Sequence, residues 1–325
     1  MDMHHLVLAI LSSPLWSSSR DLVPKSLERR TEIEGLDVAW YWRTFRDFLG
    51  PAPSMEACAE DYVRNGPRLS RSPNMAFDEA FYRRQYPEVD RMVRTGKIAS
   101  GWAHYLDCGA NSSYDPAAWF DDRWYRTTYN EVNSAISRGS LSCAFEHFLL
   151  YGIRQDLSPS IYFNSAWYRK TYMNNEAANR QFPVAHYLSS KQHLRPSPTP
   201  IFDSNWYAEQ YLSSGRTVDR AKELSPFEHY MQIGRYIGYS PSARFDERAY
   251  RDAYPELGEI LKEGKYATGF EHYICEGLLN GFVASGHMQS AGSDYSGPKY
   301  FETYEQAIAL HVKRIAELRE LVETA

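Results

Sequence analysis

Five histidines return at regular places along the chain, and three of them follow a glutamate. The histidines are His104, His147, His186, His229 and His272, and the glutamates are Glu146, Glu228 and Glu271. A carboxylate beside an imidazole can serve general acid–base catalysis. Catalysis needs one asymmetric group of residues, however, whereas a residue that returns once in every repeat usually answers a structural need that also returns. The pattern therefore favours histidines that hydrogen-bond a neighbouring helix or loop over a catalytic or metal-binding role.

The short motifs of common active sites are missing from the sequence. It has no Gly-rich phosphate loop, no G-x-S-x-G, no H-E-x-x-H and no D-x-D. The four cysteines, Cys58, Cys108, Cys143 and Cys275, share no C-x-x-C spacing and fall at different places in the repeats, which favours free buried thiols. We therefore predict that the chain is not an enzyme and holds neither a metal nor a cofactor.

Composition is that of a globular protein and limits the partners. Of the 325 residues, 43% are hydrophobic and 24% charged, and the net charge of −5 gives no reason to expect nucleic-acid binding. The longest apolar run, Leu6 to Leu11, is too short to span a membrane. No Lys or Arg precedes it, so it makes no convincing signal peptide, and we expect synthesis in the cytoplasm. The final localisation stays undetermined, and a surface-exposed or virion assembly is compatible with the sequence.

A repeat of about forty residues covers most of the chain. It begins with a Phe followed by Asp or Asn, at intervals of 43, 43, 39 and 43 residues: Phe77-Asp78, Phe120-Asp121, Phe163-Asn164, Phe202-Asp203 and Phe245-Asp246. An aromatic pair, or Ala249-Tyr250 in the last copy, comes four residues later, then a Tyr four residues after the pair, and then the recurring histidine. A Gly follows the histidine by five residues in four copies, and Lys191 takes its place in the other. An earlier, degenerate copy contains Leu36-Asp37 and Asp61-Tyr62.

The repeat predicts an all-α array of short helices. Its boundaries place an N-terminal segment at 1–35 and six repeats at 36–76, 77–119, 120–162, 163–201, 202–244 and 245–285. Single copies of this size cannot bury their own aromatic side chains, so we expect neighbouring copies to stack.

Local residue types suggest how each repeat folds. Asp78, Asp121, Asn164, Asp203 and Asp246 are suited to be helix N-caps. The preceding Phe and the Tyr four residues after the cap should form a hydrophobic staple, and Pro87 and Pro255 suit the start of a second helix. Ser225 with Glu228 and Thr268 with Glu271 resemble capping boxes, and Gly234 and Gly277 are predicted to be left-handed C-caps.

The C-terminal part has a different pattern. Residues 286–299 are rich in Gly and Ser and indicate a loop, and residues 300–325 indicate a long helix. Phe301, Ile308, Ile315 and Val322 recur every seven residues, as in a coiled coil. This helix either caps the last repeat or mediates self-association or contact with a protein partner.

The repeat also has a resemblance to a known group of sequences. The pattern F-D-x-x-W-Y-x-x-x-Y…S-P-x-E-H-Y-x-x-x-G…P-S is most complete from Phe202 to Ser242. It resembles a repeat of bacterial proteins of surface-polysaccharide synthesis and modification, often found beside glycosyltransferase or sulfotransferase domains. Tyr86 and Tyr254 keep the start of a Y-P-D-V-like segment, but the usual E-G-R-x-P ending is degraded after Gly234. The resemblance covers about three quarters of the chain and implies a glycan-related setting, with no catalytic role for the repeat itself.

Aromatic residues are the candidates for binding a glycan, because their faces can stack on sugar rings. Tyr, Phe and Trp make up 15% of the chain. Trp124, Trp167 and Trp206 recur in the repeat and fit a packing role better than a ligand platform, although stacked repeats could align them. Four tyrosines assigned to the loops after the recurring Gly are the better candidates, because loops often hold binding residues: Tyr114, Tyr151, Tyr236 and Tyr239.

These patterns favour a non-catalytic binding or scaffold protein associated with a bacterial surface polysaccharide. Several repeats would each make a weak contact to an extended glycan, and their number would supply the affinity. Two alternatives stay open. The chain could be a structural subunit of a surface appendage or phage-like particle, a virion component that oligomerises through its C-terminal helix. It could also be an accessory subunit of a glycan-synthesis complex.

Overall fold

The structure is a computed structural model that describes residues 33–50, 54–190, 195–213, 224–278 and 280–284. Within these residues the protein is helical and has no strand, only two isolated bridges, Ser160 with Phe163 and Ser242 with Phe245. The prediction of an all-α fold is confirmed for this part of the chain. The predicted loop at 286–299 and the helix at 300–325 lie outside the described residues.

The chain divides into two compact bodies, residues 1–189 and residues 190–325. The boundary falls inside the predicted repeat 163–201. The helices of the N-terminal body are α2 (Val38–Leu49), α3 (Met55–Asn65), α4 (Glu79–Gln85), α5 (Pro87–Arg94), α6 (Gly101–His104), α7 (Asp122–Thr128), α8 (Asn130–Ser137), α9 (Ala144–Leu150), α10 (Ser165–Tyr172), α11 (Glu176–Asn179) and α12 (Pro183–Ser189). The helices of the C-terminal body are α13 (Ser204–Tyr207), α14 (Pro226–Gln232), α15 (Glu247–Ala253), α16 (Leu257–Lys262) and α17 (Gly269–His272).

The first helix of each repeat begins at the Asp or Asn that follows the repeated Phe. In α4, for example, the Asp78 side chain accepts a hydrogen bond from the Phe81 N–H at 2.9 Å. The same cap is made by Asp37, Asp121, Asn164, Asp203 and Asp246. The oxygen satisfies an N–H group that the helix itself leaves unpaired, which fixes the start of the helix.

The backbone of the cap residue ties each repeat to its own end. The Asp78 N–H donates to the Pro116 carbonyl at 2.9 Å, and the Asp121 N–H donates to Pro159 at 3.1 Å. Asp37 makes this bond with Pro73, and Asp203 makes it with Pro241. A repeat therefore closes on itself, because its last residues return to the start of its first helix.

The repeated Phe packs on the second ring of the aromatic pair. Ring centroids lie 5.0 Å apart for Phe77 and Tyr82, and 5.3 Å apart for Phe120 and Tyr125. The same contact joins Phe163 to Tyr168, Phe202 to Tyr207 and Phe245 to Tyr250. Both rings are buried in all five cases, so this hydrophobic staple also forms the core of the repeat.

The start of the second helix differs between the two proline-containing copies. Helix α5 begins at Pro87, as predicted, because a first-turn position needs no N–H donor. Helix α16 begins at Leu257, so Pro255 lies in the turn before it.

The third helix is capped in two ways. Ser225 forms the predicted capping box with Glu228. Thr268 caps α17 by accepting from the Glu271 N–H, but the Glu271 carboxylate accepts from the Ala267 N–H, so this box is shifted by one residue. In addition, the buried carboxylates of Glu79 and Glu247 accept two N–H bonds each at the starts of α6 and α17.

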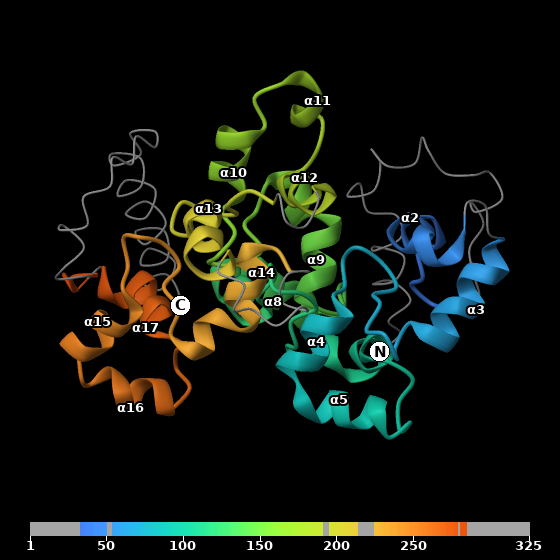
Figure 1. The fold of residues 1–325 in the computed structure, drawn as a ribbon, viewed down its shortest axis with the longest axis horizontal. Coiled ribbons are helices and arrows are strands. Elements are labelled where there is room, and N and C mark those ends of the chain that lie inside the picture. The colour runs from blue at the N-terminus through green and yellow to red at the C-terminus, as the bar shows by residue number, and fades with distance from the viewer. Residues whose placement is uncertain (1–32, 51–53, 191–194, 214–223, 279, 285–325) are drawn as a thin grey trace. The chain divides into compact units, whose positions relative to one another are not determined.

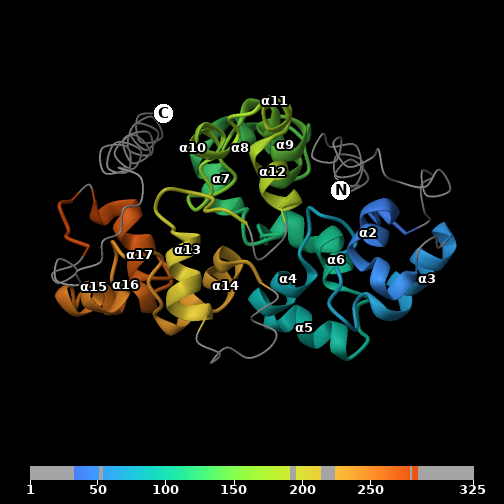
Figure 2. The ribbon, with the colours of Figure 1, turned by 45° about the horizontal axis from the view of Figure 1, so that its top comes forward.

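Neighbouring helices pack through these aromatic side chains. Helices α2 and α3 lie side by side (Figures 1 and 2). Between them Tyr41 is buried against Tyr62, with ring centroids 5.6 Å apart. In the C-terminal body, α15 and α17 are in contact (Figure 1). No helix among the described residues is long and apolar enough to cross a membrane.

Candidate functional site

Each recurring histidine is hydrogen-bonded to the buried tyrosine of its own repeat. Tyr82 Oη lies 2.8 Å from His104 Nδ1, and Tyr125 Oη lies 2.9 Å from His147 Nδ1. The same pair is formed by Tyr168 with His186, Tyr207 with His229 and Tyr250 with His272, at 2.8 to 3.0 Å. One polar bond thus links the first helix of a repeat to its last helix, inside an aromatic core.

Burial keeps both partners of this bond neutral. It lowers the pKa of His104, His147, His186 and His272, because a charged imidazole loses its hydration there. It also raises the pKa of Tyr125 far above its usual value. A neutral imidazole and a neutral hydroxyl can each donate or accept, so the direction of this hydrogen bond depends on the histidine tautomer.

The Gly five residues after the histidine makes room for the tyrosine hydroxyl. A Cβ at Gly109, Gly152, Gly234 or Gly277 would clash with the hydroxyl of the Tyr in its own repeat. The prediction that Gly234 and Gly277 are left-handed C-caps is wrong, since neither has a positive φ. The physical requirement is space, not backbone conformation. Lys191, which replaces this Gly in one copy, lies outside the described residues.

The left-handed residue comes four positions after that Gly. Gly238 and Gly281 have φ values of +79° and +75°, and non-glycine residues hold the same conformation at Ser113 and Asp156. Ser70 has it too, nine residues after Asp61, as the others lie nine residues after their histidines. This residue reverses the chain after the last turn of the repeat.

The first repeat makes the core bond with different residues. Asp61 stands at the histidine position and accepts from the Tyr41 hydroxyl at 2.7 Å. Arg71 pairs with the same carboxylate at 2.7 Å and lies over the rings of Phe45 and Phe48. Burial alone would raise the pKa of Asp61, but hydrogen bonds from Asn65, Tyr41 and Arg71 lower it. The carboxylate stays charged because Arg71 compensates it.

Two of the four candidate tyrosines close the repeat by stacking. The Tyr114 ring stacks on Tyr86 at 4.1 Å, and the Tyr239 ring stacks on Tyr211 at 3.9 Å. The residue after each donates its N–H to the hydroxyl of the partner ring, Asp115 to Tyr86 and Ser240 to Tyr211. One face of Tyr114 and of Tyr239 is therefore occupied by the repeat itself.

The other two tyrosines point more of their surface to solvent. Tyr151 is 50% exposed and is the C-cap of helix α9, so the assignment of Tyr151 to the loop after Gly152 is wrong. Tyr236 is 54% exposed, and the Arg235 guanidinium lies 4.7 Å from its ring centroid. Trp124, Trp167 and Trp206 are half-buried, each edge-on against the Tyr five residues later.

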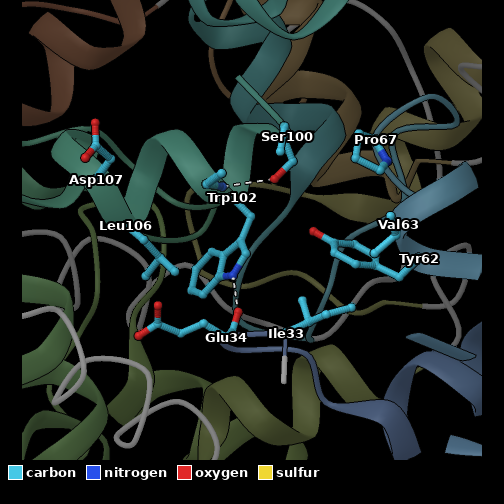
Figure 3. A pocket seen from close by; sticks show the side chains of 11 residues that line it. Ile33, Glu34, Tyr62, Val63, Pro67, Ser100, Trp102, Leu106 and Asp107 are labelled. Carbon is cyan, nitrogen blue, oxygen red and sulfur yellow. Dashed lines mark hydrogen bonds between the residues drawn. The ribbon is translucent and has the colours of Figure 1, made fainter. Parts of the chain in front are cut away.

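A pocket of about 570 Å³ lies between the first two repeats, in the N-terminal body (Figure 3). Its lining comes from three segments, at 33–34, 62–67 and 99–107. The indole N–H of Trp102 donates to the Glu34 carbonyl at 2.8 Å and holds two of these segments together. The sequence alone does not reveal this pocket, because its lining comes from three segments that lie far apart in the chain: 33–34 before the first copy, 62–67 in the first copy and 99–107 in the second.

Metal-binding and disulfide chemistry are not evident in this part of the chain. Among the described residues, no group of three or more His, Cys, Asp and Glu side chains could hold a metal ion. None of the four cysteines, all of which lie in the described part of the chain, forms a disulfide; Cys58 and Cys143 are buried, Cys275 is half-buried and Cys108 is exposed, so the prediction of buried thiols is wrong for Cys108.

Comparison with known proteins returns no relative. No family model, no curated protein and no solved structure matches the chain. Any functional conclusion therefore rests on the residues of this chain.

The coiled-coil candidates Phe301, Ile308, Ile315 and Val322 lie outside the described residues.

Proposed function

We propose that the chain is a non-catalytic scaffold of six repeats that binds an extended glycan, in a setting of bacterial surface polysaccharide. The main support is that the aromatic residues fall into two groups, one buried and one exposed. The repeated tyrosines are buried in the core, while Tyr151 and Tyr236, which only single copies have, keep about half of their surface exposed.

The polar residues that could have served catalysis are engaged in the fold. His147 is bonded to Tyr125 in the core, and the Glu146 carboxylate accepts from the Ser142 N–H at 2.6 Å. Glu228 closes the capping box of α14 and pairs with Arg195. These contacts support a role in folding for the Glu-His pairs and leave surface binding as the function that fits the remaining side chains.

The proposed ligand is a long chain of sugar residues. A single exposed ring contributes little to affinity, so useful binding requires several weak contacts along one polymer. Sugar rings can pack on exposed tyrosine faces, and the arginine beside Tyr236 can donate hydrogen bonds to hydroxyl or acidic groups.

A pull-down of the full chain on immobilised polysaccharide tests the proposal. The expected result is retention on a long capsule-type polysaccharide and loss of retention with short oligosaccharides of the same composition. Replacing Tyr151 and Tyr236 with Ala should weaken retention at least tenfold without lowering the thermal midpoint.

The matched control is Phe48→Ala, which removes an aromatic ring that is 76% exposed but lies outside these segments. Retention of this variant should equal that of the unmodified chain. Equal retention of all variants, or no retention on a panel of charged and neutral polysaccharides, contradicts the proposal.

A further inference from the structure

The chain contains two Asn-Gly dipeptides, Asn65-Gly66 and Asn280-Gly281. In such a dipeptide the backbone nitrogen of the glycine can attack the side-chain amide carbon of the asparagine, because glycine has no Cβ to hinder the approach. A succinimide ring forms and ammonia leaves. Water then opens the ring to aspartate or to isoaspartate, in which the former side-chain carbon has become part of the main chain.

Asn65 is held in a conformation that resists this reaction. It is the last residue of α3, and the Gly66 N–H donates to the Tyr62 carbonyl at 2.8 Å. The Asn65 side-chain amide donates to the Asp61 carboxylate at 2.8 Å. Ring closure would have to break both hydrogen bonds and take Asn65 out of its helical conformation, so it requires local unfolding of the end of α3.

Asn280 is not restrained in this way. It is an exposed turn residue, and within the described part of the chain its side chain makes no hydrogen bond. Gly281 is exposed as well and has φ +75°, with no atom within 4 Å of the place where a Cβ would stand. Its N–H forms a long hydrogen bond of 3.4 Å to the Leu278 carbonyl. The attacking nitrogen and the amide that it attacks are thus both open to water and base.

The turn around Asn280 closes the last repeat. The Phe282 N–H donates to the Gly277 carbonyl at 2.8 Å, and the centroid of the Phe282 ring lies 4.4 Å from that of Tyr254. The Val283 N–H donates to the Tyr254 hydroxyl at 2.9 Å. Isoaspartate at position 280 lengthens the main chain by one carbon atom directly before these contacts and adds a negative charge, so both contacts with Tyr254 should weaken.

We propose that Asn280 is a site of spontaneous deamidation and that the isoaspartate formed there loosens the closing turn of the last repeat. Base removes the proton of the Gly281 N–H, a bond forms from this nitrogen to Asn280 Cγ, and the bond from Cγ to the amide nitrogen breaks. One water molecule is consumed and one ammonia molecule is released. The reaction needs no ligand, so it is independent of the proposed glycan binding.

Peptide mapping of the full chain during incubation at mildly alkaline pH tests the proposal. The tryptic peptide 266–299 has Asn280 as its only asparagine, so its mass gain and its separation into aspartate and isoaspartate forms report on this site alone. Asn280 should react at least about tenfold faster than Asn65, because reaction at Asn65 requires a local opening of α3. The rate at Asn280 should also rise with pH, since the attack requires a deprotonated Gly281 nitrogen.

The chain unfolded in guanidinium chloride is the matched control for the rates. Without the fold, the two dipeptides should react at similar rates, because both have glycine after the asparagine. The control for the structural effect is Asn280→Ser, which removes the reactive amide at an exposed position. Incubation should lower the thermal midpoint of the unmodified chain by roughly 2–4 °C, as expected for the loss of one hydrogen bond, and should not change that of Asn280→Ser.

Two kinds of result would overturn the proposal. The first is an equal rate at Asn65 and Asn280 in the folded chain, or an Asn280 that stays intact while the unfolded chain reacts. The second is a chain that is converted at position 280 and keeps its thermal midpoint, or an equal loss in Asn280→Ser, which would place the cause at another residue.

Discussion

A tyrosine hydroxyl and an imidazole nitrogen meet in the core of each repeat, and this contact explains three recurring residue types together. The histidine supplies a hydrogen-bond partner for a hydroxyl that would otherwise be buried without one, such as that of Tyr207 with His229 at 2.8 Å. The Gly at position 234 leaves the space that this hydroxyl occupies. Tyr, His and Gly thus form one structural unit, although 27 residues separate Tyr207 from Gly234.

Replacing Gly234 with Ala should destabilise the C-terminal body by about 1–3 kcal/mol, because the new methyl group overpacks the Tyr207 hydroxyl. Gly258→Ala is the control, since a Cβ there meets nothing within 4 Å and Gly258 lies inside α16. That change should stabilise by about 0.5–1 kcal/mol through helix propensity.

Urea unfolding of both variants measures the difference. Adding Tyr207→Phe to Gly234→Ala should recover part of the loss, because it removes the atom that clashes. A Gly234→Ala variant as stable as Gly258→Ala would show that space at this position is not limiting.

The stabilising effect of His147 should depend on pH. Burial lowers its pKa in the folded state below the usual 6.5, so the unfolded chain binds more protons as the pH falls below that value. The stabilisation is complete above pH 6.5 and declines as the pH falls through the folded-state pKa. Comparing the unfolding free energy of the unmodified chain with that of His147→Gln should show a difference of about 1–3 kcal/mol at pH 7.5, and a smaller one at pH 5.5.

The comparison with His147→Gln at each pH cancels the other titrating groups. Glu79 is one of them: burial raises its pKa to about 7, so its own effect has the opposite sign and favours folding at lower pH. A difference that stayed constant or grew toward pH 5.5 would contradict a neutral, buried His147.

At the scale of the helix and turn, hydrogen bonds join the start of each repeat to its end. The cap residue donates its N–H to a proline carbonyl near the end of the repeat, as Asp121 does to Pro159. The Tyr129 hydroxyl accepts the Ser158 N–H at 2.9 Å in the same region. Between these points the chain must reverse, and it does so through one left-handed residue.

Ser113 holds that left-handed conformation at φ +58° without being glycine. Ser113→Gly should stabilise the N-terminal body by about 1 kcal/mol, because Gly adopts positive φ without steric cost. Ser112→Gly is the control, since Ser112 lies in the right-handed 3₁₀ turn of Ala110–Ser112 and should lose stability. Thermal unfolding measures both, and a loss of stability in both variants would contradict the account of this turn.

Structural features that depend on residues close together in the chain could be predicted from the sequence, whereas contacts between distant segments could not. The start of α7 is fixed by Asp121 and the staple by Phe120 and Tyr125, all within six residues, so spacing alone indicates them. The reason for Gly234 depends on Tyr207 in another helix. The left-handed conformation at Ser113 and Asp156 could not be predicted, because neither residue is a glycine.

At the scale of the whole molecule, the repeats share their core residues but differ in their exposed residues. The first repeat replaces the Tyr–His bond by Tyr41, Asp61 and Arg71, and it shares the aromatic pocket with the second repeat. The pocket could not be predicted, since its lining combines segments as far apart in the chain as Glu34 and Asp107, which are 73 positions apart. We infer that the common residues maintain the fold and that recognition depends on the residues that vary.

A double-mutant cycle on Tyr125 and His147 tests that inference most directly. The unfolding free energies of Tyr125→Phe, His147→Leu and the double variant are compared with that of the unmodified chain. Each single change leaves a buried polar partner unsatisfied and should cost about 1–3 kcal/mol, and the double variant should lose clearly less than the sum. Strictly additive losses, or single variants as stable as the unmodified chain, would contradict the claim that this pair holds the repeat together.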